Sequence, residues 1–183
     1  ICTLFRCSAH QLDNSGSGHC GSNADFGFAQ MIAAGASAGA DLVVFETFSD
    51  LAEARAGLLA ARETSSLPVC VTMTFDETGR TLSGCTPAAA AMALTALGAS
   101  ILGVNCSQGP GELVGIVREM ARYTSLPLAA KPNAGLPDPQ TGAYSLDPVG
   151  FARQMVQFVE AGATYLGGCC GTTPEHIRAL ASS

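Results

Sequence analysis

Charged side chains are scarce in this sequence of 183 residues. Lysine, arginine, aspartate and glutamate together make up 13% of the chain, whereas hydrophobic residues make up 48%. A chain of this length and composition can bury a sizeable core in one domain, so intrinsic disorder is excluded. Basic residues are fewer than acidic ones, and the net charge of −6 argues against nucleic acid or an anionic membrane as a partner.

Long apolar runs are also lacking. No run reaches the ~18 residues that a membrane span requires, and no basic-then-apolar leader marks an export signal. The eight cysteines would suggest disulfides in a small secreted protein, but this chain is large enough to fold without them. We therefore expect a cytoplasmic protein whose thiols are reduced.

Strand-like and helix-like segments alternate from residue 24 onward. Short apolar runs, typical of strands covered on both faces, predict strands at Leu42–Thr47, Val69–Phe75, Ile101–Cys106, Leu128–Pro132 and Tyr165–Cys169. Alanine-rich stretches with helical spacing predict helices at Asp25–Ala38, Leu51–Thr64, Pro87–Leu97, Gly111–Tyr123, Pro148–Ala161 and Pro174–Ala181. This alternation implies parallel strands with right-handed crossovers.

The pattern fits either a (β/α) barrel or an open, doubly wound sheet. No G-x-G-x-x-G opens a helix, which weakens the dinucleotide-binding version of the open sheet. Residues 1–23 differ from the rest, because their "HQLDNSGSGHCGSN" stretch is polar and glycine-rich. We expect an arm of unassigned structure at 1–23 and one domain at 24–183.

Three cysteines lie at the ends of two of the predicted strands. Cys106 ends one strand, and Cys169 and Cys170 end another, about sixty residues later. Active sites of parallel sheets and barrels form at the carboxyl ends of the strands, so these thiols can converge there. Glycines on both sides of the Cys169–Cys170 pair supply the backbone freedom that lets both thiols reach one ion.

Three converging thiolates are typical of a zinc site with one open corner. Such a site carries a net charge of about −1, so zinc in it activates water poorly. It is better suited to holding a substrate thiol as a thiolate nucleophile. The alternative is that the three cysteines only fill space as small buried hydrophobic residues.

Other polar residues have simpler explanations. Turn chemistry accounts for Asp76 and Glu77, and His176 suits the start of a helix. Lys131 suits a polar wall, with contact to a phosphate or carboxylate as the alternative. A second zinc set could be drawn from ligands in the arm, namely Cys7, His10, His19 and Cys20.

Several motifs resemble the homocysteine S-methyltransferase family, in particular the homocysteine-binding module of corrinoid-dependent methionine synthases. The likeness covers residues 24–183 and rests on "ETFSDLAEARAGLLAARE", "VTMTFDETGRTLSG", "LGVNCSQGP", "KPNAGLP" and "GGCCGTTPEHIRAL". The resemblance implies a (β/α)8 TIM-type barrel in the α/β class. It also implies zinc ligands at Cys106, Cys169 and Cys170, a substrate-binding role for Glu46, and a place in the site wall for Asn105 and Asn133.

The resemblance further implies zinc-dependent methyl transfer to the thiol of homocysteine, giving methionine. The donor could be methylcobalamin, recharged by methyltetrahydrofolate on a separate domain or chain. S-methylmethionine, S-adenosylmethionine and betaine are the other donors that the family uses. No residue stands out as a catalytic acid or base.

The chain also departs from the family. The glycine-rich "DGAMGT"-like strand end of family members is missing, and about five C-terminal βα units are recognisable. We therefore expect an incomplete barrel, whose open edges favour a homo-oligomer. The alternative function is a truncated zinc-thiolate protein without methyl-transfer turnover.

Overall fold

The structure, a computed structural model, describes residues 4–8 and 23–183. Its strands form one six-stranded sheet in the order β1-β2-β3-β4-β5-β6. The strands are β1 (Leu4–Ser8), β2 (Leu42–Phe48), β3 (Val69–Met73), β4 (Ile101–Asn105), β5 (Leu128–Lys131) and β6 (Ala163–Leu166). The helices are α1 (Asn23–Ser37), α2 (Leu51–Thr64), α3 (Pro87–Ala96), α4 (Pro110–Met120), α5 (Pro148–Glu160) and α6 (Pro174–Ala181).

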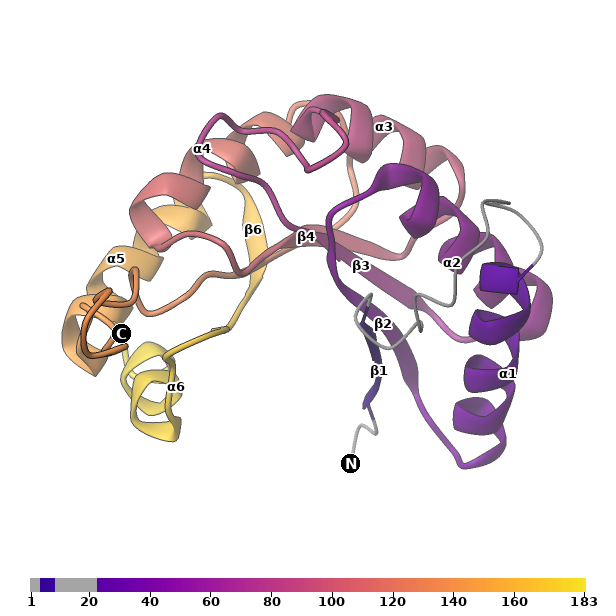
Figure 1. Cartoon of the computed structure of the whole chain (residues 1–183), viewed down its shortest axis with the longest axis horizontal. Helices are drawn as coiled ribbons and strands as arrows, with labels where there is room; N and C mark the ends of the chain where they lie inside the picture. Colours follow the sequence, from indigo (N-terminus) through magenta and orange to yellow (C-terminus); the bar gives the residue numbers. More distant parts are fainter. Residues whose placement is uncertain (1–3, 9–22) are drawn as a thin grey trace.

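The sheet is a section of a barrel. Each strand pairs in parallel with the next one along the chain, and a helix lies between every two consecutive strands. In Figure 1 the sheet curves like an arch, with helices along its outer side and with β1 and β6 at its two ends. This confirms the incomplete barrel and excludes the doubly wound sheet, in which helices would cover both faces.

All five predicted βα units are present, as β2–α2 through β6–α6. A sixth unit precedes them, because β1 pairs with β2 from Leu4↔Leu42 to Ser8↔Glu46. β1 lies inside the segment 1–23, for which the sequence predicts only an arm of unassigned structure. Its five residues, "LFRCS", stand beside a long polar stretch that hides the strand signal.

Element boundaries follow local chemistry. Proline occupies the first turn of α3, α5 and α6, as predicted. Asp147 caps α5 by accepting a hydrogen bond from the backbone N–H of Gly150 at 2.7 Å.

The last strand was predicted as Tyr165–Cys169, but β6 spans Ala163–Leu166. The chain leaves the sheet at the Gly167–Gly168 pair, so both cysteines lie in the loop that follows.

The core lies between the sheet and its helices. A cluster of rings made by Phe28, Phe45 and Phe48 joins α1 to β2, with centroids 5.4 to 6.0 Å apart. All three rings are fully buried. Gly57 of α2 lets that helix approach, because a Cβ atom there would lie 3.1 Å from the Phe45 ring. Among the described helices, none has the length and apolar character needed to cross a bilayer.

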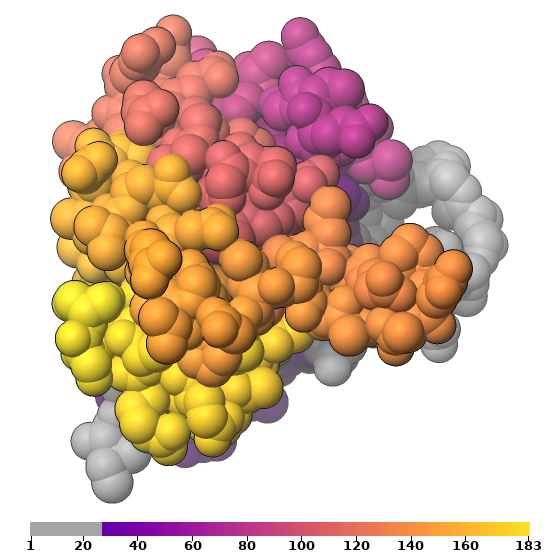
Figure 2. All heavy atoms as spheres, turned by 90° about the vertical axis from the view of Figure 1, so that its left-hand side faces the viewer, coloured from indigo at the N-terminus to yellow at the C-terminus, as the bar shows by residue number. Residues whose placement is uncertain are grey.

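A long loop connects β5, which ends at Lys131, to α5, which begins at Pro148. Figure 2 shows it in orange as a lobe that projects beside the helices of the C-terminal half. An antiparallel bridge between Pro137 and Tyr144 closes it on itself. Asp138 stabilises its tip by accepting hydrogen bonds from the backbone N–H groups of Gln140 and Thr141.

Candidate metal centre

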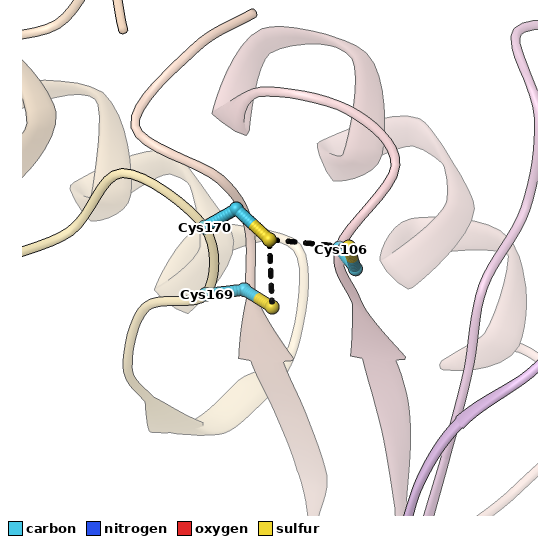
Figure 3. A group of neighbouring side chains, drawn as sticks. All are labelled: Cys106, Cys169 and Cys170. Carbon is cyan, nitrogen blue, oxygen red and sulfur yellow. Dashed lines mark hydrogen bonds between the residues drawn. The ribbon is translucent and has the colours of Figure 1, made fainter. Parts of the chain in front are cut away.

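Three sulfur atoms meet at the carboxyl end of the sheet. Cys106 directly follows β4, and Cys169 and Cys170 lie in the loop after β6 (Figure 3). The sulfur of Cys170 lies 3.7 Å from that of Cys106 and 3.9 Å from that of Cys169. All three sulfurs lie within 4.8 Å of one another, and all three residues are free thiols. The structure therefore brings together the three cysteines singled out in the sequence.

The spacing of the sulfurs fits one tetrahedral ion. Zinc–sulfur bonds of about 2.3 Å place two sulfurs of a tetrahedron about 3.8 Å apart. The two shorter separations, 3.7 and 3.9 Å, match that value. A tetrahedral ion held by these three sulfurs would have its fourth corner open to another ligand. Within the part of the chain that the structure describes, no other group of three or more metal-binding side chains was found.

A sharp turn after β4 aims the Cys106 thiol at the cluster. Cys106 and Ser107 have φ angles of 63° and 56°, in the left-handed region that non-glycine residues seldom adopt. Two hydrogen bonds, one to the end of β5 and one to the segment after β3, stabilise the turn. The Cys106 backbone N–H donates to the carbonyl of Lys131 at 3.1 Å, and the Ser107 hydroxyl donates to the carbonyl of Phe75.

The loop of the cysteine pair is tied to the segment after β5. The Cys169 N–H donates to the Pro132 carbonyl at 2.9 Å, and the Cys170 carbonyl accepts from the Ala134 N–H at 2.9 Å. Between these bonds, the Cys170 N–H donates to the Asn133 side-chain oxygen at 3.0 Å. Three hydrogen bonds thus fix the backbone of both cysteines.

Gly171 is required immediately after the pair. Its φ of 79° suits glycine, and a Cβ atom there would lie 2.1 Å from the Tyr144 ring of the β5–α5 lobe. The ring thus packs directly on the loop that carries the thiols. Burial and the nearby Cys170 raise the pKa of the Tyr144 hydroxyl, so Tyr144 stays neutral beside the thiolates.

The cysteines differ in acidity because of their surroundings. The adjacent Cys106 thiol and the Asn105 amide lower the pKa of Cys169 to about 5, against the effect of burial. The same contact with Cys169, together with burial, raises the pKa of Cys106. At neutral pH these two shifts favour the thiolate at Cys169 and the thiol at Cys106.

Zinc binding should therefore weaken as pH falls. The Cys106 proton must leave when an ion binds, so the affinity should drop about tenfold per pH unit for that proton alone. Below about pH 5 Cys169 is protonated as well, and the slope should steepen by about one more proton. Competition with a chromophoric chelator between pH 4.5 and 8 measures this slope. A pH-independent affinity would contradict thiolate ligation.

The predicted substrate residues lie in or near this end of the sheet. Glu46 on β2 is buried, and its carboxylate forms an ion pair with Lys131 of β5. The sequence favoured a polar wall for Lys131 over contact with a phosphate or carboxylate, and it did not identify Glu46 as the partner. Asn105 and Asn133 are also buried, and each contacts the cysteine loop through its side chain.

Other candidates have structural roles. His176 is buried at the start of α6, where its Nδ1 accepts from the Thr173 N–H at 3.1 Å and its Nε2 donates to the Leu146 carbonyl at 3.0 Å. Asp76 accepts hydrogen bonds from Thr78 and Arg80 in a turn, as predicted. The second zinc set that the arm could offer lies outside the residues whose side chains are described.

Comparison with known proteins identifies relatives. A sequence model described as "Homocysteine S-methyltransferase" matches residues 22–183. Methionine synthases of Mycobacterium leprae and Mycobacterium tuberculosis are each 37% identical over 153 residues, which is 79% of this chain. The aligned region is 13% of each of those proteins, so the chain spans a small part of their length.

Solved structures show the same fold. The apo form of the homocysteine methyltransferase MmuM from Escherichia coli has a TM-score of 0.74 at 24% identity, over 98% of this chain and 60% of that one. The metallated form has a TM-score of 0.72 at 26% identity, over 92% of this chain and 54% of that one. The arch thus superimposes on part of a larger TIM barrel.

Proposed function

Because the chain belongs to the homocysteine S-methyltransferase family, we propose that it takes part in zinc-dependent methyl transfer to the thiol of homocysteine, giving methionine. The observation that carries the proposal is the convergence of Cys106, Cys169 and Cys170 with the spacing of a tetrahedral ion. Three sulfurs leave one corner free, and homocysteine would supply the fourth.

Zinc bound by the three cysteines would supply the Lewis acidity that keeps the substrate sulfur deprotonated at neutral pH. The sulfur lone pair then forms a bond to the methyl carbon while the bond from that carbon to the donor breaks, and the electron pair leaves with the donor. The protein's part is to hold the sulfur in line with the methyl group. The fixed loop of Cys169 and Cys170 provides that rigidity.

The ion pair between Glu46 and Lys131 gives the site a means to bind an amino acid. A homocysteine zwitterion offers an ammonium group for Glu46 and a carboxylate for Lys131. The pair joins β2 to β5 across the inner side of the arch, so both charges are held near the carboxyl ends of the strands. When the substrate binds, the ion pair between Glu46 and Lys131 is replaced by two ion pairs with the substrate. These two pairs offset the cost of separating Glu46 from Lys131.

The methyl donor is proposed from the family alone. Methylcobalamin, recharged by methyltetrahydrofolate on a separate domain or chain, fits the methionine synthase relatives. S-methylmethionine, S-adenosylmethionine and betaine are the alternatives.

We place the reaction in the cytoplasm, where thiols stay reduced. A zinc-thiolate protein without turnover is less favoured, because its relatives are named as methyltransferases and methionine synthases.

Adding homocysteine to the zinc-loaded protein should raise the number of sulfur ligands from three to four. X-ray absorption at the zinc edge measures this count, and the substrate thiol should release about one proton near pH 7. A spectrum with three sulfurs at saturating homocysteine would contradict an open substrate corner.

Glu46→Gln provides the matched control for that experiment. The substitution keeps the shape of the side chain but removes the charge that would bind the ammonium group. The variant should show the same three-sulfur spectrum without substrate, and it should need on the order of tenfold or more homocysteine to reach four sulfurs, as expected for a lost charge-assisted contact. Equal homocysteine affinity in both proteins would remove Glu46 from the substrate site.

A further inference from the structure

The side-chain amide of Asn105 has a fixed orientation. It is fully buried, and its Oδ1 accepts hydrogen bonds from the Thr47 backbone N–H at 3.0 Å and from the Thr72 hydroxyl at 2.7 Å. A backbone N–H can only donate, so the atom that faces it must be the amide oxygen. The amide nitrogen is therefore on the other side, where it must donate.

The two N–H groups of that nitrogen have different acceptors. One faces the hydroxyl oxygen of Thr47 at 2.7 Å, and the other faces the sulfur of Cys169 at 3.8 Å. All four hydrogen-bonding positions of the amide are thereby used, with none left for a substrate. The amide nitrogen of Asn105 thus contacts the sulfur of a proposed metal ligand.

Backbone strain is concentrated around this amide. Among the described residues, the non-glycine positions with positive φ are Thr47 at 67°, Cys106 at 63° and Ser107 at 56°. Thr47 donates to the amide of Asn105, and Cys106 follows Asn105 in the chain. A β-branched residue such as threonine keeps a positive φ only where its surroundings enforce it. Such strain is typical of functional sites, and here it lies next to the sulfur cluster.

We propose that Thr47, Thr72 and Asn105 form a positioning unit, in which two threonines lock the amide so that its N–H holds the Cys169 sulfur in place. The hydrogen bond draws electron density from that sulfur and so sets how strongly it donates to a metal. None of the three touches the substrate in this role. The inference rests on the proposed function in one respect, namely that the cysteines bind a metal ion.

Cobalt(II) in place of zinc makes the effect visible, because thiolate-to-cobalt charge-transfer absorption reports electron donation by sulfur. Thr72→Val keeps the shape of a fully buried side chain and removes one donor to the amide. The T47V/T72V double variant also removes the hydroxyl that fixes the amide nitrogen. We expect the band to move to longer wavelength in both variants. Because loss of the fixed sulfur position outweighs the stronger donation, cobalt affinity, measured against a chelator, should fall about 10-fold in the first and up to about 100-fold in the second.

Thr81→Val is the matched control. Thr81 is also a buried threonine, but its hydroxyl contacts Ser83 and the Cys85 N–H, away from the sulfur cluster. Its band and cobalt affinity should equal those of the unaltered chain. A purely structural role for Thr72 would lower the thermal stability of Thr72→Val and leave the band unchanged.

The outcomes separate this inference from the proposed function. An unaltered chain that shows no thiolate-to-cobalt absorption would contradict the metal site and, with it, this inference. A normal band in the unaltered chain and the same band in T47V/T72V would overturn only the positioning unit. Asn105→Ala tests the amide directly, and the threonine variants decide the matter if that variant does not fold.

Discussion

Replacing Cys169 and Cys170 together with alanine is expected to abolish zinc binding, which in the unaltered chain should reach about one ion per molecule. Single replacement of Cys106, Cys169 or Cys170 should remove most of it. Thiolate sites of structural zinc contribute roughly 10–16 kcal/mol. If three sulfurs share this energy, each accounts for about 4 kcal/mol, on the order of a 10³-fold change in affinity.

Metal content after dialysis, measured by plasma emission, tests this expectation. The matched control is Cys70→Ala, because Cys70 lies in β3 and burial raises the pKa of its thiol to about 11, which suits a neutral core residue. It should keep full zinc occupancy and lose only some stability. Full occupancy in the C169A/C170A variant would end the three-thiolate interpretation.

The sequence predicted the part of the fold that depends on local pattern. The helix bounds Leu51–Thr64 and Pro174–Ala181 were predicted without error, because polar residues or proline mark their starts. β6 was misplaced because two of its four residues, Thr164 and Tyr165, are exposed. Its "ATYL" sequence therefore lacks the apolar run that marked the inner strands. β1 was missed because five residues beside a polar arm give no pattern of their own, and their pairing with β2 is a long-range property.

The sequence predicted some features of the candidate site and not others. The sequence predicted that the three thiols meet, since parallel strands bring their carboxyl ends together. It could not predict that Lys131 would pair with Glu46, because β2 and β5 are not neighbours in the sheet. Nor could it show the direction of the Asn105 amide, which depends on Thr47 and Thr72 from two other strands.

The open ends of the sheet have a physical cost. β1 and β6 are edge strands, so each presents unpaired backbone groups along one side. An apolar cleft of about 480 Å³ lies beside β6, and its lining includes Val156 and Val159 of α5, Leu166 of β6, and Ile177 and Leu180 of α6. Each 100 Å² of apolar surface left uncovered forgoes roughly 2.5 kcal/mol, against a typical total stability of about 5–15 kcal/mol.

The isolated chain of 183 residues is therefore expected to self-associate, with the β6 end of one copy covering that of another, or to be poorly soluble. Sedimentation velocity over a hundredfold range of concentration measures this. Val159→Lys places a charge in the cleft, where Val159 is 58% exposed, and should shift the protein toward monomer. Val149→Lys, at an α5 position that is 61% exposed and outside the cleft lining, should not.

Supplying the N-terminal barrel units of a family member should also yield a monomer, because a closed barrel has no edges. A cooperatively folding monomer of the unaltered chain alone would show that the edges are stable in water without a partner.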